Sequence, residues 1–133
     1  MASILVVEDD VLIRLGILAV LEAAGHRCQG VGSRERALGA LAEGAVDLVV
    51  LDWRLADGGC GRDVALAGFR QGIPVLVASA TASETEARDV WATAVLPKPF
   101  TPHALRRAVE LALQAGAFPP LPVMAGAVGS WAA

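Results

Sequence analysis

The chain has 133 residues, a formal net charge of −3 and an apolar share of 55%. This length fits one domain that can bury its own core, and the acidic balance without a basic stripe excludes a typical nucleic-acid-binding surface. No apolar run approaches the roughly 20 residues of a membrane span, and no N-terminal segment has the pattern of a secretory signal. The two cysteines, Cys28 and Cys60, lack metal-like spacing. We therefore expect a cytoplasmic protein that binds neither nucleic acid nor membrane.

Short apolar runs alternate with helical patterns along the whole chain. Strands are predicted at residues 4–7, 27–31, 46–51, 75–78 and 94–96. Helices are predicted at residues 11–24, from the cap Ser33 to 43, at 62–70, at 83–90 as a short helix, and from the cap Thr101 to 115. The strands are apolar throughout, which is typical of a parallel sheet covered on both faces. The pattern predicts an α/β fold with a doubly wound, five-stranded parallel sheet and five helices.

The chain divides into one domain and a tail. The domain covers residues 1–117 and contains every predicted element. Residues 118–133 are rich in proline, glycine and alanine and are apolar, so we expect a tail that is flexible or packed on a partner.

Polar side chains follow the predicted strands at their carboxyl ends, where doubly wound sheets bind their ligands. These side chains are Glu8 and Asp9, Asp52, Ser79 and Lys98. Asp10 is better placed to cap the helix that follows it. Adjacent carboxylates repel one another unless a cation lies among them, so this edge of the sheet is the candidate site.

The candidate residues form one chemical set. Asp9, Asp52 and a backbone carbonyl could hold Mg²⁺, which prefers a few protein oxygens plus waters, with Glu8 reaching it through water. Lys98 adds a cation and Ser79 a hydroxyl, a combination suited to phosphoryl transfer. Lys98 is the single lysine beside ten arginines, which indicates a position that needs a compact ammonium group.

Four motifs resemble those of the receiver domain of two-component response regulators. They are VVEDD, VVLDWRL, VLVASA and PKPF, each at the end of a predicted strand. The resemblance covers residues 4 to about 115. It implies a flavodoxin-like sheet with strand order 2-1-3-4-5 and a signalling phosphoprotein that is a regulator and not an enzyme.

The resemblance also assigns roles to residues. Asp52 would be the phosphoacceptor, taking a phosphoryl group from a phosphohistidine of a sensor histidine kinase or histidine phosphotransferase to form a 4-aspartylphosphate. Asp9 and Asp52 would ligate Mg²⁺ together with the backbone carbonyl of Arg54, and Glu8 would orient a metal-bound water.

Other residues of the motifs would grip and tune the phosphoryl group. Lys98 and Ser79 would bind its oxygens, and the peptide bond between Lys98 and Pro99 would be cis. Arg54 and Thr81 flank the site and should influence how fast the acyl phosphate hydrolyses.

The chain departs from the family pattern near the fourth helix. Val95 stands where the family usually has an aromatic residue that rotates with the switch hydroxyl. The stretch between Ser79 and Lys98 is shorter than usual by about one helical turn, and Trp91 lies within it. These departures resemble a subgroup of stand-alone receivers with a Phe-Ala-Thr-Gly-like fourth strand, and they affect the output route and not the phosphorylation chemistry.

The first helix carries more apolar residues than one buried face needs. We expect its buried face to be Ile13, Ile17, Val20 and Leu21. A second stripe, together with Trp91, is a candidate partner surface for a kinase helix pair, a second copy in a homodimer or the apolar tail. The stripe consists of Val11, Leu15 and Leu18.

Several functions compete at this point. A receiver without an output domain could bind a partner when phosphorylated or drain phosphate from a kinase. A Mg²⁺-dependent phosphatase with an aspartate nucleophile would want an acid at position 54, where this chain has arginine. A nucleotide- or flavin-binding module would want glycines where the chain has Glu8 and Asp9. A degenerate receiver used as a binding module is the remaining alternative.

Overall fold

Five strands form one parallel sheet in a computed structural model of the chain, which describes residues 1–54, 61–80 and 92–116. The strand order is β2-β1-β3-β4-β5, which confirms the predicted order. The strands are β1 (Ser3–Val7), β2 (Arg27–Val31), β3 (Leu48–Asp52), β4 (Val75–Ser79) and β5 (Ala94–Pro97). The last strand, β5, ends in Pro97 and lies at the edge of the sheet. Proline has no amide hydrogen to donate, and an edge strand tolerates this because it has a neighbouring strand on one side only.

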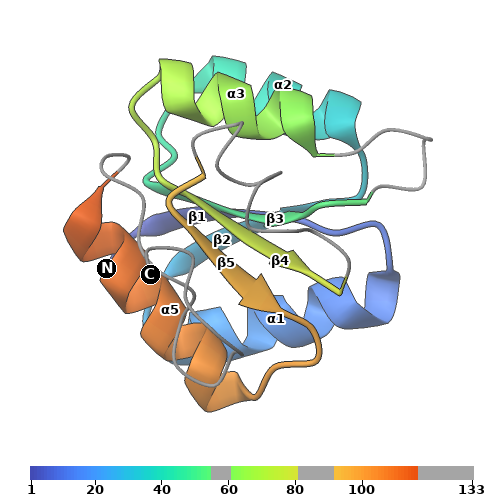
Figure 1. Cartoon of the computed structure of the whole chain (residues 1–133), viewed down its shortest axis with the longest axis vertical. Helices are drawn as coiled ribbons and strands as arrows, with labels where there is room; N and C mark the ends of the chain where they lie inside the picture. The colour runs from blue at the N-terminus through green and yellow to red at the C-terminus, as the bar shows by residue number, and fades with distance from the viewer. Residues whose placement is uncertain (55–60, 81–91, 117–133) are drawn as a thin grey trace.

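Two layers of helices cover the sheet (Figure 1). The helices are α1 (Val11–Ala23), α2 (Arg34–Glu43), α3 (Arg62–Arg70) and α5 (Pro102–Ala115). The predicted helix at residues 83–90 lies outside the described residues. Among the helices of the described ranges, none is both long and apolar enough to cross a bilayer.

The core is divided into two clusters by the sheet. One cluster lies under α2 and α3 and contains Leu5 and Val7, and the other lies under α1 and α5 and contains Ile4 and Val6. Successive residues of a strand point to opposite faces, so a strand buried on both sides must be apolar at every position. This explains why the strands read as continuous apolar runs.

The third strand begins two residues later than predicted. The chain is still turning at Ala45, whose φ is 62°. The Asp47 carboxylate accepts a hydrogen bond from the Ser3 amide at 2.8 Å, so regular pairing begins with Leu48 opposite Ile4. The prediction of a strand at residues 46–51 was therefore wrong at its start.

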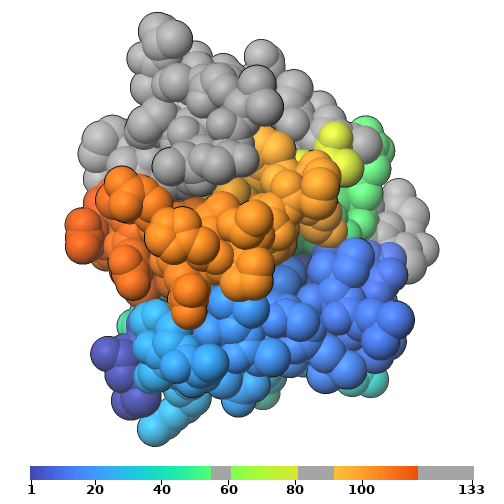
Figure 2. Space-filling view, turned by 90° about the horizontal axis from the view of Figure 1, so that it is seen from below, coloured from blue at the N-terminus to red at the C-terminus, as the bar shows by residue number. Residues whose placement is uncertain are grey.

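The orientation of α1 also differs from the prediction. Ile13, expected on the buried face, is 41% exposed. Leu18, expected on the open stripe, is half-buried and covers Gly30 of β2, where an added Cβ would lie 2.8 Å from Leu18 Cδ1. The helix packs against both β2 and α5, and Figure 2 shows α1 in blue beside α5 in orange. Contacts with β2 and α5 determine which residues of α1 are buried. Helical periodicity alone does not specify these contacts.

Each predicted helix cap is present. Asp10 Oδ1 accepts a hydrogen bond from the Ile13 amide at 3.0 Å. Ser33 and Thr101 cap α2 and α5 in the same way, through the amides three residues on. Side-chain oxygens at these positions satisfy amides that have no partner inside the helix.

Replacing Asp10 with alanine should lower the free energy of unfolding by about 1 kcal/mol, because the first turn of α1 loses its cap. Asp10→Ser should retain most of this stability, since a serine hydroxyl can accept the same hydrogen bond. Urea unfolding of the two variants compares them directly. If both variants were equally unstable, the cap would not be the cause.

Candidate functional site

The site lies at the carboxyl edge of the sheet, where the central strands end side by side. Val7 of β1 is paired with Leu51 of β3, so Glu8, Asp9 and Asp52 emerge together. The next strand, β4, ends in Ser79, and its carbonyl accepts a hydrogen bond from the Lys98 amide at 3.1 Å. Parallel pairing therefore gathers residues that are far apart in the sequence.

Three carboxylates form a tight cluster at this edge. Glu8, Asp9 and Asp52 each offer an oxygen, and these atoms lie within 4.8 Å of one another. The Glu8 side chain is almost completely buried, at 2% exposure, and Asp9 and Asp52 are partly buried. A set of carboxylate oxygens at this spacing suits a hard divalent cation such as Mg²⁺.

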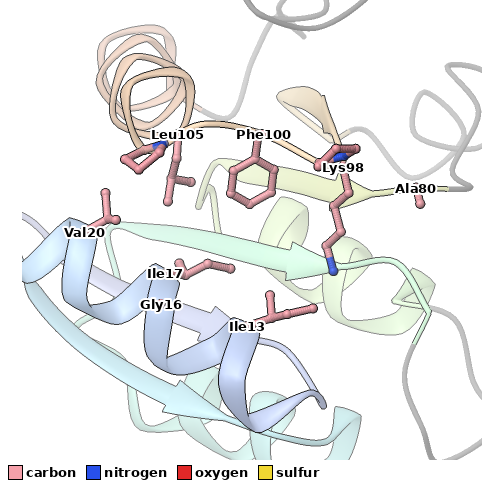
Figure 3. Close-up of a pocket in the computed structure, with 10 residues that line it drawn as sticks. Ile13, Gly16, Ile17, Val20, Ala80, Lys98, Phe100 and Leu105 are labelled. Carbon is pink, nitrogen blue, oxygen red and sulfur yellow. The ribbon is translucent and has the colours of Figure 1, made fainter.

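The Lys98 side chain supplies a positive charge to the cluster. Its Nζ lies 2.5 Å from Glu8 Oε1 and 3.5 Å from Asp52 Oδ1. Figure 3 shows this side chain extending from the loop after β5 toward α1 and β3. The lysine thus bridges two acids that come from different strands, and the peptide bond that follows it, to Pro99, is cis, as expected.

Arg14 is part of this arrangement and was missed by sequence reasoning. Its Nη1 donates to the backbone carbonyl of Glu8 at 2.8 Å, while the Glu8 amide donates to the Val31 carbonyl at 3.0 Å. The guanidinium lies over Gly32, where an added Cβ would be 2.9 Å from Nη1. The glycines of the β2 segment were the available signal, because they leave room for a long side chain from α1.

The crowding changes the acidity of Asp52. Burial raises the pKa of its carboxyl group, and the nearby charge of Glu8 raises it further, against an opposing effect of Lys98. The resulting pKa is about 7, compared with an ordinary value of 3.8. Near neutral pH the Asp52 carboxyl group is therefore only partly ionised. An added cation would favour its ionised form.

The pKa values of the neighbouring Asp9 and Lys98 shift in the directions that favour their charged forms, unlike the pKa of Asp52. Burial acts to raise the pKa of Asp9, but hydrogen bonding with Glu8 and Asp52 outweighs it and the pKa is lowered. Burial acts to lower the pKa of Lys98, but its hydrogen bond to Glu8 and the charge of Asp52 outweigh it and the pKa is raised. The surroundings of Lys98 therefore favour its charged form.

The remaining candidate residues occupy different surroundings. Ser79 is buried at the end of β4, and Arg54 is exposed just after β3. Val95 is buried in the apolar core cluster under α2 and α3. Thr81 and Trp91 lie outside the described residues.

The candidate partner surface on α1 is only partly as expected. Val11 and Leu15 are exposed, whereas Leu18 is half-buried against the sheet. Leu12 and Ile13, which were not assigned to the stripe, are also exposed, so the open apolar surface is the amino-terminal half of α1.

Comparisons with known proteins give one consistent family. The family described as the response regulator receiver domain matches residues 4–110. The phosphate regulon transcriptional regulatory protein PhoB of Pseudomonas aeruginosa is 31% identical over 77% of this chain and 48% of its own length. The KDP operon transcriptional regulatory protein KdpE of Escherichia coli is 32% identical over 86% of this chain and 52% of its own length. The chain thus spans about half the length of these relatives.

A solved structure agrees with the sequence matches. The chemotaxis protein CheY4 of Vibrio cholerae superposes with a TM-score of 0.78 and 25% identity, over 84% of this chain and 98% of that protein.

Replacing Asp52 with asparagine should stabilise the metal-free protein at pH 8, by roughly 1–3 kcal/mol. Below about pH 4 the carboxyl is protonated in both the folded and the unfolded chain, so the variant should have little advantage there. As the pH rises to about 7, the unfolded chain ionises while the folded chain resists. The advantage of asparagine should therefore grow over this range and then level off.

Urea unfolding at pH 5 and pH 8 in the presence of a chelator measures this effect. Asp63→Asn is a matched control, because Asp63 is exposed in an ion pair with Arg34 and such pairs contribute only about 0–1 kcal/mol. An advantage of Asp52→Asn that does not change with pH would contradict the explanation.

Proposed function

The chain belongs to the response regulator receiver domain family of two-component systems, and on that premise we propose that Asp52 accepts a phosphoryl group from a phosphohistidine. The donor would be a sensor histidine kinase or a histidine phosphotransferase. The observation that carries the proposal is the position of Asp52, which ends the central strand β3 beside the ammonium group of Lys98, and this ammonium group also pairs with the buried Glu8. The protein would act as a regulator and not as a turnover enzyme.

In the transfer step, an oxygen of the Asp52 carboxylate would attack the phosphorus atom of the donor. A new P–O bond would form as the P–N bond to the imidazole breaks, and the imidazole would leave as a neutral base after taking up a proton. The nucleophile must be ionised to attack, and with a pKa of about 7 only part of the Asp52 carboxyl group is ionised near neutral pH. Added positive charge, such as that of a bound metal ion, would increase the ionised fraction.

The acid cluster fits the Mg²⁺ that this chemistry needs. Asp9 and Asp52 would hold the ion with the backbone carbonyl of Arg54, and Glu8 would bind one of its waters. A bound Mg²⁺ would neutralise the carboxylates and the oxygens of the transferring phosphoryl group. The support for this assignment is the 4.8 Å grouping of the three carboxylate oxygens, which are the type of ligand that Mg²⁺ prefers.

Two further residues would hold the phosphoryl group. Lys98 can leave Glu8 and bind a phosphoryl oxygen, because its Nζ already lies 3.5 Å from Asp52 Oδ1. The Ser79 hydroxyl, at the end of the neighbouring strand, would bind another. With Val95 in place of an aromatic residue, the response to phosphorylation would pass through Ser79 and the backbone around it. The phosphorylated form would then change the binding of a partner or serve as a phosphate sink.

Incubation with Mg²⁺ and acetyl phosphate should add one phosphoryl group to the protein, and Asp52→Asn should abolish this addition. Intact-mass spectrometry measures the product, with chelator present as the negative control. Asp63→Asn should be phosphorylated normally, because Asp63 lies on α3 in an exposed pair with Arg34. Equal phosphorylation of Asp52→Asn, or a reaction that proceeds with the metal removed, would refute the proposal.

Replacing Lys98 with methionine should have opposite effects on two measurements. Mg²⁺ should bind about 3–30-fold more tightly, because a competing positive charge is removed from Glu8 and Asp52. Phosphorylation should nevertheless slow by about 100-fold or more, because a charge that stabilises the transferring group is lost. Titration calorimetry and the acetyl phosphate reaction measure the two effects. If metal affinity and phosphorylation fell together, Lys98 would be only a structural support for the cluster.

A further inference from the structure

A groove of about 590 Å³ lies between α1 and the start of α5. Figure 3 shows its walls: Ile13 and Ile17 from α1 lie opposite Phe100 and Leu105, and Lys98 lies toward one end. Apart from Lys98, the side chains that line it are apolar. It lies next to the acid cluster but contains none of the acids.

The groove opens onto the apolar half of α1. Ile13 is 41% exposed at its rim, and Val11, Leu12 and Leu15 are exposed nearby on the same helix. A contiguous apolar surface that is open to water indicates a binding site. We therefore expect an apolar molecule or segment to bind in the groove.

The same chain carries a segment of matching chemistry. Residues 117–133 contain no charged side chain, and residues 118–123 read Phe-Pro-Pro-Leu-Pro-Val. Prolines fix φ near the polyproline II value, so such a segment is extended and loses little entropy on binding. Grooves lined by apolar and aromatic side chains are known to bind proline-rich segments of this kind.

The segment begins at a fixed point within reach of the groove. Gly116 ends α5 with a φ of 74°, and its carbonyl accepts a hydrogen bond from Thr93 Oγ1 at 3.2 Å. From there Leu105 is about 16 Å back along the helix, at a rise of about 1.5 Å per residue. An extended chain that advances about 3.1 Å per residue covers this distance in five or six residues. An extended segment in this direction would bring Leu121 and Val123 to the level of the groove.

We propose that the groove between α1 and α5 is the docking site of the chain's own proline-rich segment, residues 118–124. Leu121 would lie between Ile13 and Leu105, and the segment would run antiparallel to α5. A tethered segment has an effective concentration in the millimolar range, so even a weak apolar contact would be well populated. The docked segment would cover the exposed part of α1 that a partner would otherwise contact.

A double-mutant cycle in the full chain tests the contact. Ile13→Glu at the groove and Leu121→Glu in the segment should each lower the urea midpoint by roughly 0.5 M. Together they should lower it no more than the larger single change, because either one already releases the segment. Additive effects of this pair would overturn the proposal.

Leu12→Glu is the matched control, because Leu12 neighbours Ile13 and is 81% exposed but does not line the groove. Its effect should add to that of Leu121→Glu. Non-additivity with Leu12 as large as that with Ile13 would also overturn the proposal, since it would show no specific contact at the groove.

Methyl nuclear Overhauser effects identify the occupant directly. In the full chain, the methyl groups of Leu121 should show contacts to those of Ile13 and Ile17. A mixed sample of differently labelled copies separates contacts within one chain from contacts between two. Contacts found only between copies would mean that a second molecule supplies the segment, and a complete lack of contacts would leave the groove to a separate partner. Either result would overturn the proposal.

Discussion

Electrostatic crowding at the carboxyl edge of the sheet is the constraint on which the site depends. Glu8, Asp9 and Asp52 place their oxygens within 4.8 Å of one another, and the positive charge beside them is that of Lys98. Its ammonium group pairs most closely with Glu8, at 2.5 Å. Burial and the charge of Glu8 raise the pKa of Asp52 to about 7, against the opposing effect of Lys98. A further cation at this site would favour the ionised form of Asp52, the proposed nucleophile. The proposed role of a metal ion is consistent with this charge balance.

The parallel sheet is what makes such crowding possible. Strands that run in the same direction end at one edge, so short local motifs separated by long stretches of chain become neighbours. The cost of placing like charges together is offset by two continuous apolar clusters, one on each face of the sheet. The buried strands form this edge, and the polar residues of the site lie where the strands leave the core.

The first helix connects the site with the surface of the protein. At its start Asp10 caps the helix, and one turn later Arg14 binds the Glu8 carbonyl. The same turns present Ile13 to the groove that Lys98 also lines. A molecule or segment that binds the groove would therefore contact both α1 and the lysine of the acid cluster. The acid cluster, which is the proposed phosphoacceptor site, and the apolar surface therefore share a boundary at Lys98.

Within the described residues, the sequence by itself determined the elements and their order, apart from the start of β3, together with the helix caps and the polar residues at the strand ends. These depend on local periodicity, on capping residues and on the rule that parallel strands end together, all of which can be read over short stretches of chain. Tertiary structure decided which atoms pair at the site. Lys98 bonds more closely to Glu8 than to Asp52, and Arg14 supports the Glu8 backbone. Which atoms these side chains reach depends on how α1 packs on the sheet and on where β5 ends within it. It also exposed Ile13 and covered Leu18, since a helix's period fixes only the spacing of its apolar residues, and its neighbours decide which of them are buried.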